Sequence, residues 1–212
     1  MSGQLVRGRN LPHWDVPGAA YFVTTCLEGS IPAQGLLDIA RDRGRLEEQN
    51  RPTDISQANW TTRLRKLSFA RTDEWLDHRP AVRHLADPKL AKIVVDALHF
   101  FVGQRYDLLS YVVMPSHFHW VFRPRMDWIE TLESSERSPR QRILHAINRH
   151  TALECNRLLG TTGQFWQHEP YDHWVRDSDE LERIVLYVES NPVEAQLVDS
   201  AEKWPFSSAF RG

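Results

Sequence analysis

"YVVMPSHFHWVF", residues 111–122, is the stretch that decides the fold. Two runs rich in β-branched and aromatic residues, 106–114 and 118–123, flank Pro115-Ser116-His117, and this pattern predicts an antiparallel hairpin with a tight turn. Side chains two apart on a strand share a face, so His117 and His119 should project together. A histidine pair in so apolar a run needs polar partners.

The elements around this hairpin are predicted from periodicity and from capping residues. Residues 19–27, after Pro17-Gly18, are dense in β-branched and aromatic side chains and indicate a strand. Residues 160–177 are expected to form a loop. Three helices are predicted: 88–101 after the cap Asp87, 139–159 between Ser138 and Gly160, and one from Ser178 that should end or turn at Pro192, with Asp177 and Glu180 resembling a capping box.

This order of elements predicts an α+β fold, with an antiparallel sheet and helices packed on one of its faces. Residues 32–88 are polar and interrupted by glycine and proline, with a helical middle over 55–69. The segment of about 33–86 is therefore expected to be a partly helical insertion within one domain spanning 1–212. A chain of 212 residues with 41% hydrophobic content can bury a core of that size.

Composition limits the function classes. The sequence contains neither a signal-peptide pattern nor a run of eighteen apolar residues, so a cytoplasmic protein that does not contact membranes is expected. Cys26 and Cys155 are far apart and form no C-x-x-C pair, so both are expected to be packing residues.

Positive charge is clustered although the net charge is −2. One cluster contains Arg63, Arg65 and Lys66, and residues 137–157 contain five arginines with a single acid between them. Such runs either contact nucleic acid or form a solvated helix face, and the pattern leaves both open. The arginines of the second run are Arg137, Arg140, Arg142, Arg149 and Arg157.

The histidine pair has two interpretations. His117 and His119 can each offer a neutral ring nitrogen to a divalent metal, or they can be ordinary polar residues on an exposed sheet face. A metal site needs a third ligand, and candidates lie on the last helix, where Tyr187 and Asn191 are four apart and share one face. The buried stripe of that helix should consist of Ile184, Val185 and Val188.

Tyr187 and Asn191 also have two interpretations, one structural and one functional. The tyrosine can pack with its hydroxyl at the rim while the asparagine caps the helix, or the tyrosine can be a nucleophile and the asparagine a metal ligand. A phenol with a pKa near 10 attacks poorly at neutral pH, so a nucleophilic tyrosine needs a nearby cation.

These residues carry a family resemblance. "MPSHFHWVF", residues 114–122, resembles the His-hydrophobic-His signature of single-tyrosine HUH transposases, and "YVESNPVEAQLV", residues 187–198, resembles the tyrosine helix of their REP-associated relatives. The departures are Glu194 and Gln196, where relatives often have a basic residue and a glycine, and Pro170, where an aromatic residue is usual. Further matching segments, in order, are "LPHWDVPGAAYFVTT" (11–25), "NRHTALECNRLLG" (148–160), "FWQHEPYDHWVRD" (165–177) and "WPFSSA" (204–209).

The resemblance implies a ferredoxin-like or RRM-like sheet with the histidine pair on a central strand. It also implies a divalent ion, Mg²⁺ or Mn²⁺, bound by His117, His119 and Asn191, and a nucleophilic Tyr187 that cleaves single-stranded or hairpin DNA. Some relatives are monomers and others dimers. The expected DNA contacts are Arg63, Arg65, Lys66, Arg149, Arg157, His173 and Arg176.

Two other functions are compatible with the same residues. A zinc-dependent hydrolase would use the histidine pair with His173 or an acidic side chain as third ligand, and a metal-bound water as nucleophile. A domesticated, catalytically silent protein would bind hairpin DNA tightly without needing the metal.

Overall fold

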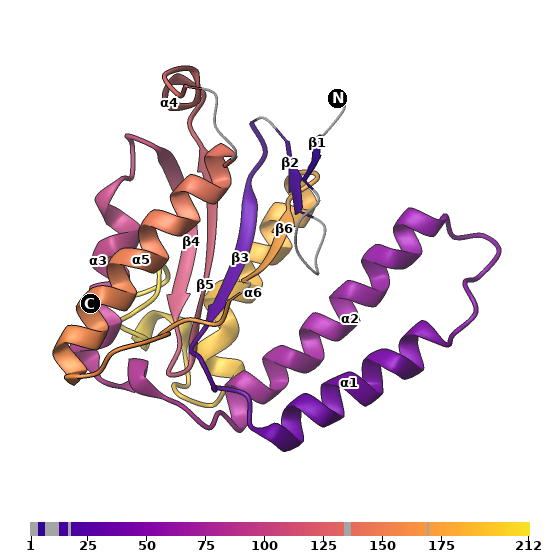
Figure 1. Ribbon diagram of the computed structural model, residues 1–212, viewed down its shortest axis with the longest axis horizontal. Coiled ribbons are helices and arrows are strands. Elements are labelled where there is room, and N and C mark those ends of the chain that lie inside the picture. Colours follow the sequence, from indigo (N-terminus) through magenta and orange to yellow (C-terminus); the bar gives the residue numbers. More distant parts are fainter. Residues whose placement is uncertain (1–3, 7–12, 17, 134–136, 169) are drawn as a thin grey trace.

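The computed structural model describes residues 4–6, 13–16, 18–133, 137–168 and 170–212 (Figure 1). Pro17, expected to precede the first long strand, and the first two residues of the segment 11–25 lie outside these ranges. Across the described ranges, no helix is both long and apolar enough to cross a membrane.

Four strands form an antiparallel sheet in the order β4-β5-β3-β6. The predicted hairpin is confirmed, although His117 is the first residue of β5 instead of part of the turn, and the connection is residues 114–116. His117 and His119 therefore lie on β5, a central strand of the sheet, as expected. The strands are β3 (Tyr21–Cys26), β4 (Tyr106–Val113), β5 (His117–Pro124) and β6 (Tyr171–Trp174), and a separate small sheet pairs β1 (Gln4–Val6) with β2 (His13–Asp15).

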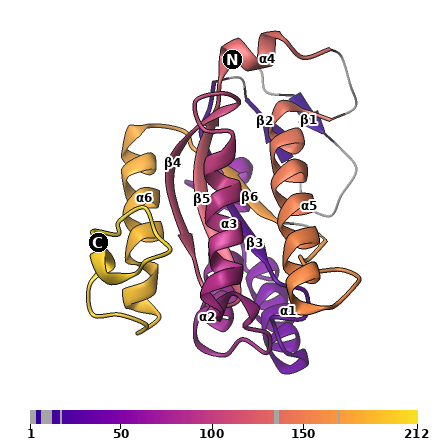
Figure 2. The same ribbon diagram turned by 90° about the vertical axis from the view of Figure 1, so that its left-hand side faces the viewer.

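Two of the predicted helices, α3 (Pro88–Phe100) and α5 (Pro139–Leu159), pack side by side on one face of the sheet (Figure 2). Their ends form where the sequence places them. Asp87 accepts a 2.8 Å hydrogen bond from the Lys89 backbone, Ser138 forms a capping box, and Gly160 ends α5 in the left-handed conformation at φ 66°. The core beneath them includes Trp120, Phe122, Leu98 and Ile143.

The opposite face of the sheet is also covered, so helices do not pack on one face only. α6 (Ser178–Glu194) lies there and buries Val188 against Val112 and Val121 (Figure 2). The helix also continues two residues past Pro192. Because proline has no N–H, the Val188 carbonyl receives no hydrogen bond from residue 192, and the helix ends within one turn, at Glu194. At the start of α6, Asp177 accepts from the Glu180 backbone, but the Glu180 side chain accepts from Arg176 instead of closing a capping box.

The segment between β3 and α3 is a helical hairpin rather than an irregular region. It contains α1 (Ala33–Glu47) and α2 (Gln57–His78), so the helix expected over 55–69 is confirmed but too short. Gly35 allows the two helices to approach closely, because a Cβ atom there would lie 2.9 Å from the Trp75 ring. Figure 1 shows this hairpin projecting from the sheet, with the C-terminal end of α2 returning to it.

Strand β6 was not predicted, because residues 160–177 are polar and were expected to form a loop. It pairs with β3 at the sheet edge, and Asp172 forms a buried ion pair with Arg140 of α5. Arg140 is therefore part of the interior and not of an exposed basic face. Cys155 is buried, Cys26 is half-buried and both are free. Short helical segments complete the described chain: α4 (Met126–Glu130), His84–Ala86 and Ala201–Lys203.

Candidate metal and tyrosine site

The histidine pair is fully buried on the α6 face of the sheet, with the two Nε2 atoms 3.0 Å apart. His117 Nδ1 lies 2.9 Å from the Ser116 hydroxyl, which donates its own hydrogen to the Leu76 carbonyl. Ser116 must therefore accept from His117 Nδ1–H, and the lone pair of His117 Nε2 faces the site. Thr24, directly opposite on β3, holds His119 Nδ1 at 2.7 Å.

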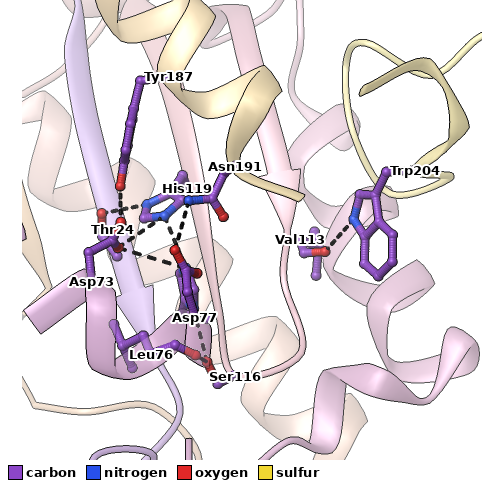
Figure 3. Close-up of polar contacts among 11 residues, drawn as sticks. Thr24, Asp73, Leu76, Asp77, Val113, Ser116, His119, Tyr187, Asn191 and Trp204 are labelled. Atoms are coloured by element: carbon purple, nitrogen blue, oxygen red, sulfur yellow. Dashed lines mark hydrogen bonds and ion pairs between the residues drawn. The ribbon is translucent and has the colours of Figure 1, made fainter. Parts of the chain in front are cut away.

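Two aspartates from α2 complete the surroundings of the pair (Figure 3). Asp73 Oδ1 lies 3.3 Å from His119 Nε2 and 3.9 Å from His117 Nε2, and Asp77 Oδ1 lies 3.6 Å from His117 Nε2. Because the aspartates are four residues apart on a helix, both point to the same side. The hydroxyl of Ser116, bonded to Leu76 between them, attaches this turn of α2 to the β4–β5 connection.

Helix α6 supplies the other two expected residues. The Tyr187 hydroxyl donates a hydrogen bond to Asp73 Oδ2, and its ring lies 5.5 Å from the His119 ring, centroid to centroid. Asn191 is fully buried and its amide nitrogen donates to Asp77 Oδ2 at 3.3 Å. The structure thus brings both residues to the histidine pair, as the resemblance implied, but through two carboxylates that the sequence did not single out.

The ionisable groups perturb one another strongly. Burial, followed by the neighbouring His119, lowers the pKa of His117 to about 3, so this ring is neutral. Burial and the charge of Asp73 raise the pKa of Asp77 to about 8. Burial opposes ionisation of Asp73 as well, but the two histidines and the Tyr187 hydroxyl hold its pKa below the ordinary value. Burial and then Asp73 raise the pKa of Tyr187.

Asp73, His117 and His119 form a group that fits a divalent cation. One donor atom from each lies within 4.8 Å of the others. Neighbouring donors around an octahedral ion are about 3.0 Å apart and opposite ones about 4.2 Å, for bonds of about 2.1 Å. The observed separations of 3.0, 3.3 and 3.9 Å lie within that span. Asp73 Oδ1 is buried and accepts no hydrogen bond, so a cation would satisfy it.

One cleft borders this group, and a second cleft adjoins the first. A cleft of about 480 Å³ between α2 and α6 is lined by Asp73, Asp77 and Tyr187. A second, of about 320 Å³, lies between the hairpin and β6. Phe69 and Tyr171 border both clefts and stack with ring centroids 4.1 Å apart. An extended ligand that passed along the clefts would therefore meet aromatic rings beside the buried donors.

The expected DNA contacts are divided between the two faces of the sheet. The second cleft is lined by Arg65, Lys66, His173 and Arg176. Arg63 lies on the exposed side of α2, with its guanidinium 5.9 Å from the Trp60 ring. Arg149 and Arg157 are exposed on α5, so the sheet separates them from the histidines, and Arg157 pairs with Glu154 at 2.7 Å.

His173 is occupied by a different partner. Its Nε2 lies 3.0 Å from buried Glu180, which also binds Lys66 Nζ at 2.7 Å and the Arg176 backbone N–H at 3.0 Å. The cluster joins α2, β6 and the start of α6, and His173 does not share the metal-binding group. Of the two third ligands considered for a zinc hydrolase, only the acidic side chain has a counterpart here, Asp73.

Glu180 should make the fold sensitive to acid. Burial opposes its ionisation, but Lys66 and the Arg176 N–H lower its pKa from 4.5 to about 2. Because the folded pKa is depressed, this stabilisation is present above the ordinary pKa and is lost as pH falls through the folded value. The free energy of unfolding is measured with urea at about pH 6 and about pH 3. Between these two pH values, wild type should lose about 1–3 kcal/mol more of this free energy than Glu180→Gln. Glu182→Gln, at an exposed position of α6, should show the same difference in unfolding free energy between the two pH values as wild type.

Asp73 and Asp77 are the site residues that sequence reasoning missed. The signal was "DEWLD", residues 73–77, where two acids four apart must share a helix face. On a long polar helix this spacing is common, and only the return of α2 to the sheet gives it meaning.

The sheet order, with a helix after each of its first and third strands, defines a ferredoxin-like fold, and the His-x-His pair lies on a central strand. Searches with family models and among curated proteins found no match. Among solved structures, a REP-associated tyrosine transposase bound to a REP hairpin is similar, with a TM-score of 0.54 and 14% identity. The match covers 95% of this chain and 82% of that one, and it confirms the family resemblance at the level of the fold.

Proposed function

We propose that this protein cleaves and rejoins single-stranded DNA through a covalent 5′-phosphotyrosine at Tyr187, with the help of a divalent cation. The observation that carries the proposal is the contact of the Tyr187 hydroxyl with Asp73, whose other oxygen lies 3.3 Å from His119 Nε2. Nucleophile and cation ligands are thereby joined through one carboxylate. Because Tyr187 and this group lie side by side within one chain, we propose that the tyrosine acts on its own subunit's site.

In the proposed reaction, the Tyr187 oxygen forms a bond to phosphorus as the bond from phosphorus to the 3′-oxygen breaks. Asp73 already accepts the phenolic hydrogen and is placed to take the proton, and the leaving oxygen becomes a 3′-hydroxyl after gaining one. A bound divalent cation would polarise the phosphodiester and stabilise its developing charge. Because one phosphate ester replaces another, a 3′-hydroxyl can reverse the step and join strands.

His117, His119 and Asp73 are the proposed cation ligands. Asn191, the ligand implied by the family resemblance, would need to turn its carboxamide, because its nitrogen faces Asp77. Two imidazoles also suit zinc, but a carboxylate ligand and the position of the group beside clefts lined by basic side chains favour Mg²⁺ or Mn²⁺.

The proposed substrate is single-stranded DNA flanking a hairpin. The similar solved structure contains a REP hairpin, and here Arg65, Lys66 and Arg176 border a cleft that continues to Tyr187. Basic side chains beside the Phe69–Tyr171 stack are the combination that binds single strands, through phosphates and base stacking. Arg149 and Arg157, on the other face, would contact only DNA that extends around the sheet.

A metal-dependent phosphodiester hydrolase is the second candidate, favoured by the Asp/His/His composition of the group. Its nucleophile would be water, and its product a free 5′-phosphate without a protein adduct.

The test is to incubate the protein with labelled hairpin DNA from the region flanking its own gene, with Mn²⁺ or with EDTA, and to run a denaturing protein gel. We expect label to comigrate with the protein only when Mn²⁺ is present. Labelled cleavage fragments without an adduct would support the hydrolase instead, and hairpin binding without cleavage would support a silent DNA-binding protein.

A further inference from the structure

We propose that Asp77 is a fourth protein ligand of the cation, and that Asn191 acts by positioning it. The inference rests on the proposed function for the identity of the ion as divalent. It makes the α1–α2 hairpin a structural part of the metal site, because α2 would then contribute two of the four ligands.

The geometry around Asp77 matches that of Asp73. In each carboxylate one oxygen is held by α6: Tyr187 donates to Asp73 Oδ2 and Asn191 donates to Asp77 Oδ2. In each, Oδ1 is buried and accepts no hydrogen bond; Asp73 Oδ1 lies near both histidines, and Asp77 Oδ1 lies near His117. The side chains of Asp73 and Asp77 are only 7% and 8% exposed.

The Oδ1 atom of Asp77 lies close to one of these ligands. It is 3.6 Å from His117 Nε2, near the donor separations of about 3.0 and 4.2 Å around an octahedral ion. The donor atoms of Asp73, His117 and His119 lie within 4.8 Å of one another and Asp77 is outside that group, so its side chain must shift toward the cation to bind it. Both carboxylates are buried, and each has an Oδ1 atom that accepts no hydrogen bond, so ionising both without a counterion would be costly. A divalent cation bound by both would supply that counterion.

Asn191 is better suited to holding Asp77 than to binding the ion. Its nitrogen, not its oxygen, is directed at the site in Figure 3, and the oxygen is buried without a hydrogen-bond partner. With this orientation, the asparagine fixes Asp77 Oδ2 and leaves Oδ1 for the cation.

The experiment measures Mn²⁺ affinity by electron paramagnetic resonance, on the full chain and without DNA. We expect Asp77→Asn to weaken binding about tenfold or more and Asn191→Ala to weaken it less. Glu74→Gln removes the same charge from an exposed position of α2 and should match wild type. Asp77→Glu keeps a carboxylate and should retain more affinity than Asp77→Asn.

Equal or weaker loss in Asp77→Asn than in Asn191→Ala would overturn the inference and return the ligand role to Asn191. Circular dichroism of the metal-free variants checks folding. If Asp77→Asn is unfolded, Asp77→Ala, which also removes the carboxylate, is compared with Asn191→Ala in its place, and the same order is required. The DNA adduct is measured separately, so wild type that binds Mn²⁺ without forming an adduct would refute the proposed function and leave the metal site intact.

Discussion

Replacement of Tyr187 by phenylalanine is expected to abolish the covalent DNA adduct and to reduce strand cleavage by more than about 1,000-fold. The substitution removes only the hydroxyl. The ring remains packed in edge contact with Phe22 and Phe69, with centroids 5.9 and 6.4 Å away, so the fold should be retained. The adduct assay on a denaturing gel and hairpin binding by gel shift measure the two effects separately, and binding should persist.

Tyr171→Phe is the matched control for this prediction. Tyr171 borders the same cleft and stacks on Phe69, but its hydroxyl has no role in the proposed chemistry. This variant should form the adduct at a rate close to that of wild type. If Tyr187→Phe still cleaved DNA in the presence of Mn²⁺, water would be the nucleophile and the hydrolase would be the better account.

The second large effect is expected from His119→Ala. Changes to groups that only orient metal ligands typically cost 10- to 100-fold, so loss of a buried ligand should reduce cleavage by at least about 100-fold. Mn²⁺ binding should fall in parallel because His119 Nε2 lies close to both His117 and Asp73.

The surface variant His150→Ala, on exposed α5, should cleave and bind Mn²⁺ like wild type. Hairpin binding by His119→Ala should remain, since the DNA-binding side chains are elsewhere. Unchanged Mn²⁺ affinity in His119→Ala would contradict the proposed metal site.

The part of the site that lies on regular, strongly patterned elements could be predicted from the sequence. Alternation in β5 places His117 and His119 on one face, and helical spacing places Tyr187 and Asn191 on one side of α6. The meeting of these pairs was implied by the family resemblance and not by spacing, because nothing local states how α6 packs on the sheet.

The remainder depended on contacts between distant segments. Asp73 and Asp77 lie on a polar helix whose pattern is that of a solvated surface, and their role follows from where α2 returns to the sheet. Similarly, Arg140 is one of several arginines in a basic run of the sequence. Its burial became evident only from the structure, where it forms an ion pair with Asp172. Strand β6 was missed because an edge strand this short has little apolar alternation to reveal it.

The most direct test of the central claim is to identify the residue that carries the DNA. The protein is allowed to react with hairpin DNA and Mn²⁺ and is then treated with nuclease and trypsin. Tandem mass spectrometry should find a nucleotide attached through its 5′-phosphate to Tyr187, within the peptide 184–203. A nucleotide bound to this tyrosine through its 5′-phosphate is the predicted result. Cleaved DNA with an unmodified Tyr187, or a nucleotide on another residue, would contradict the account.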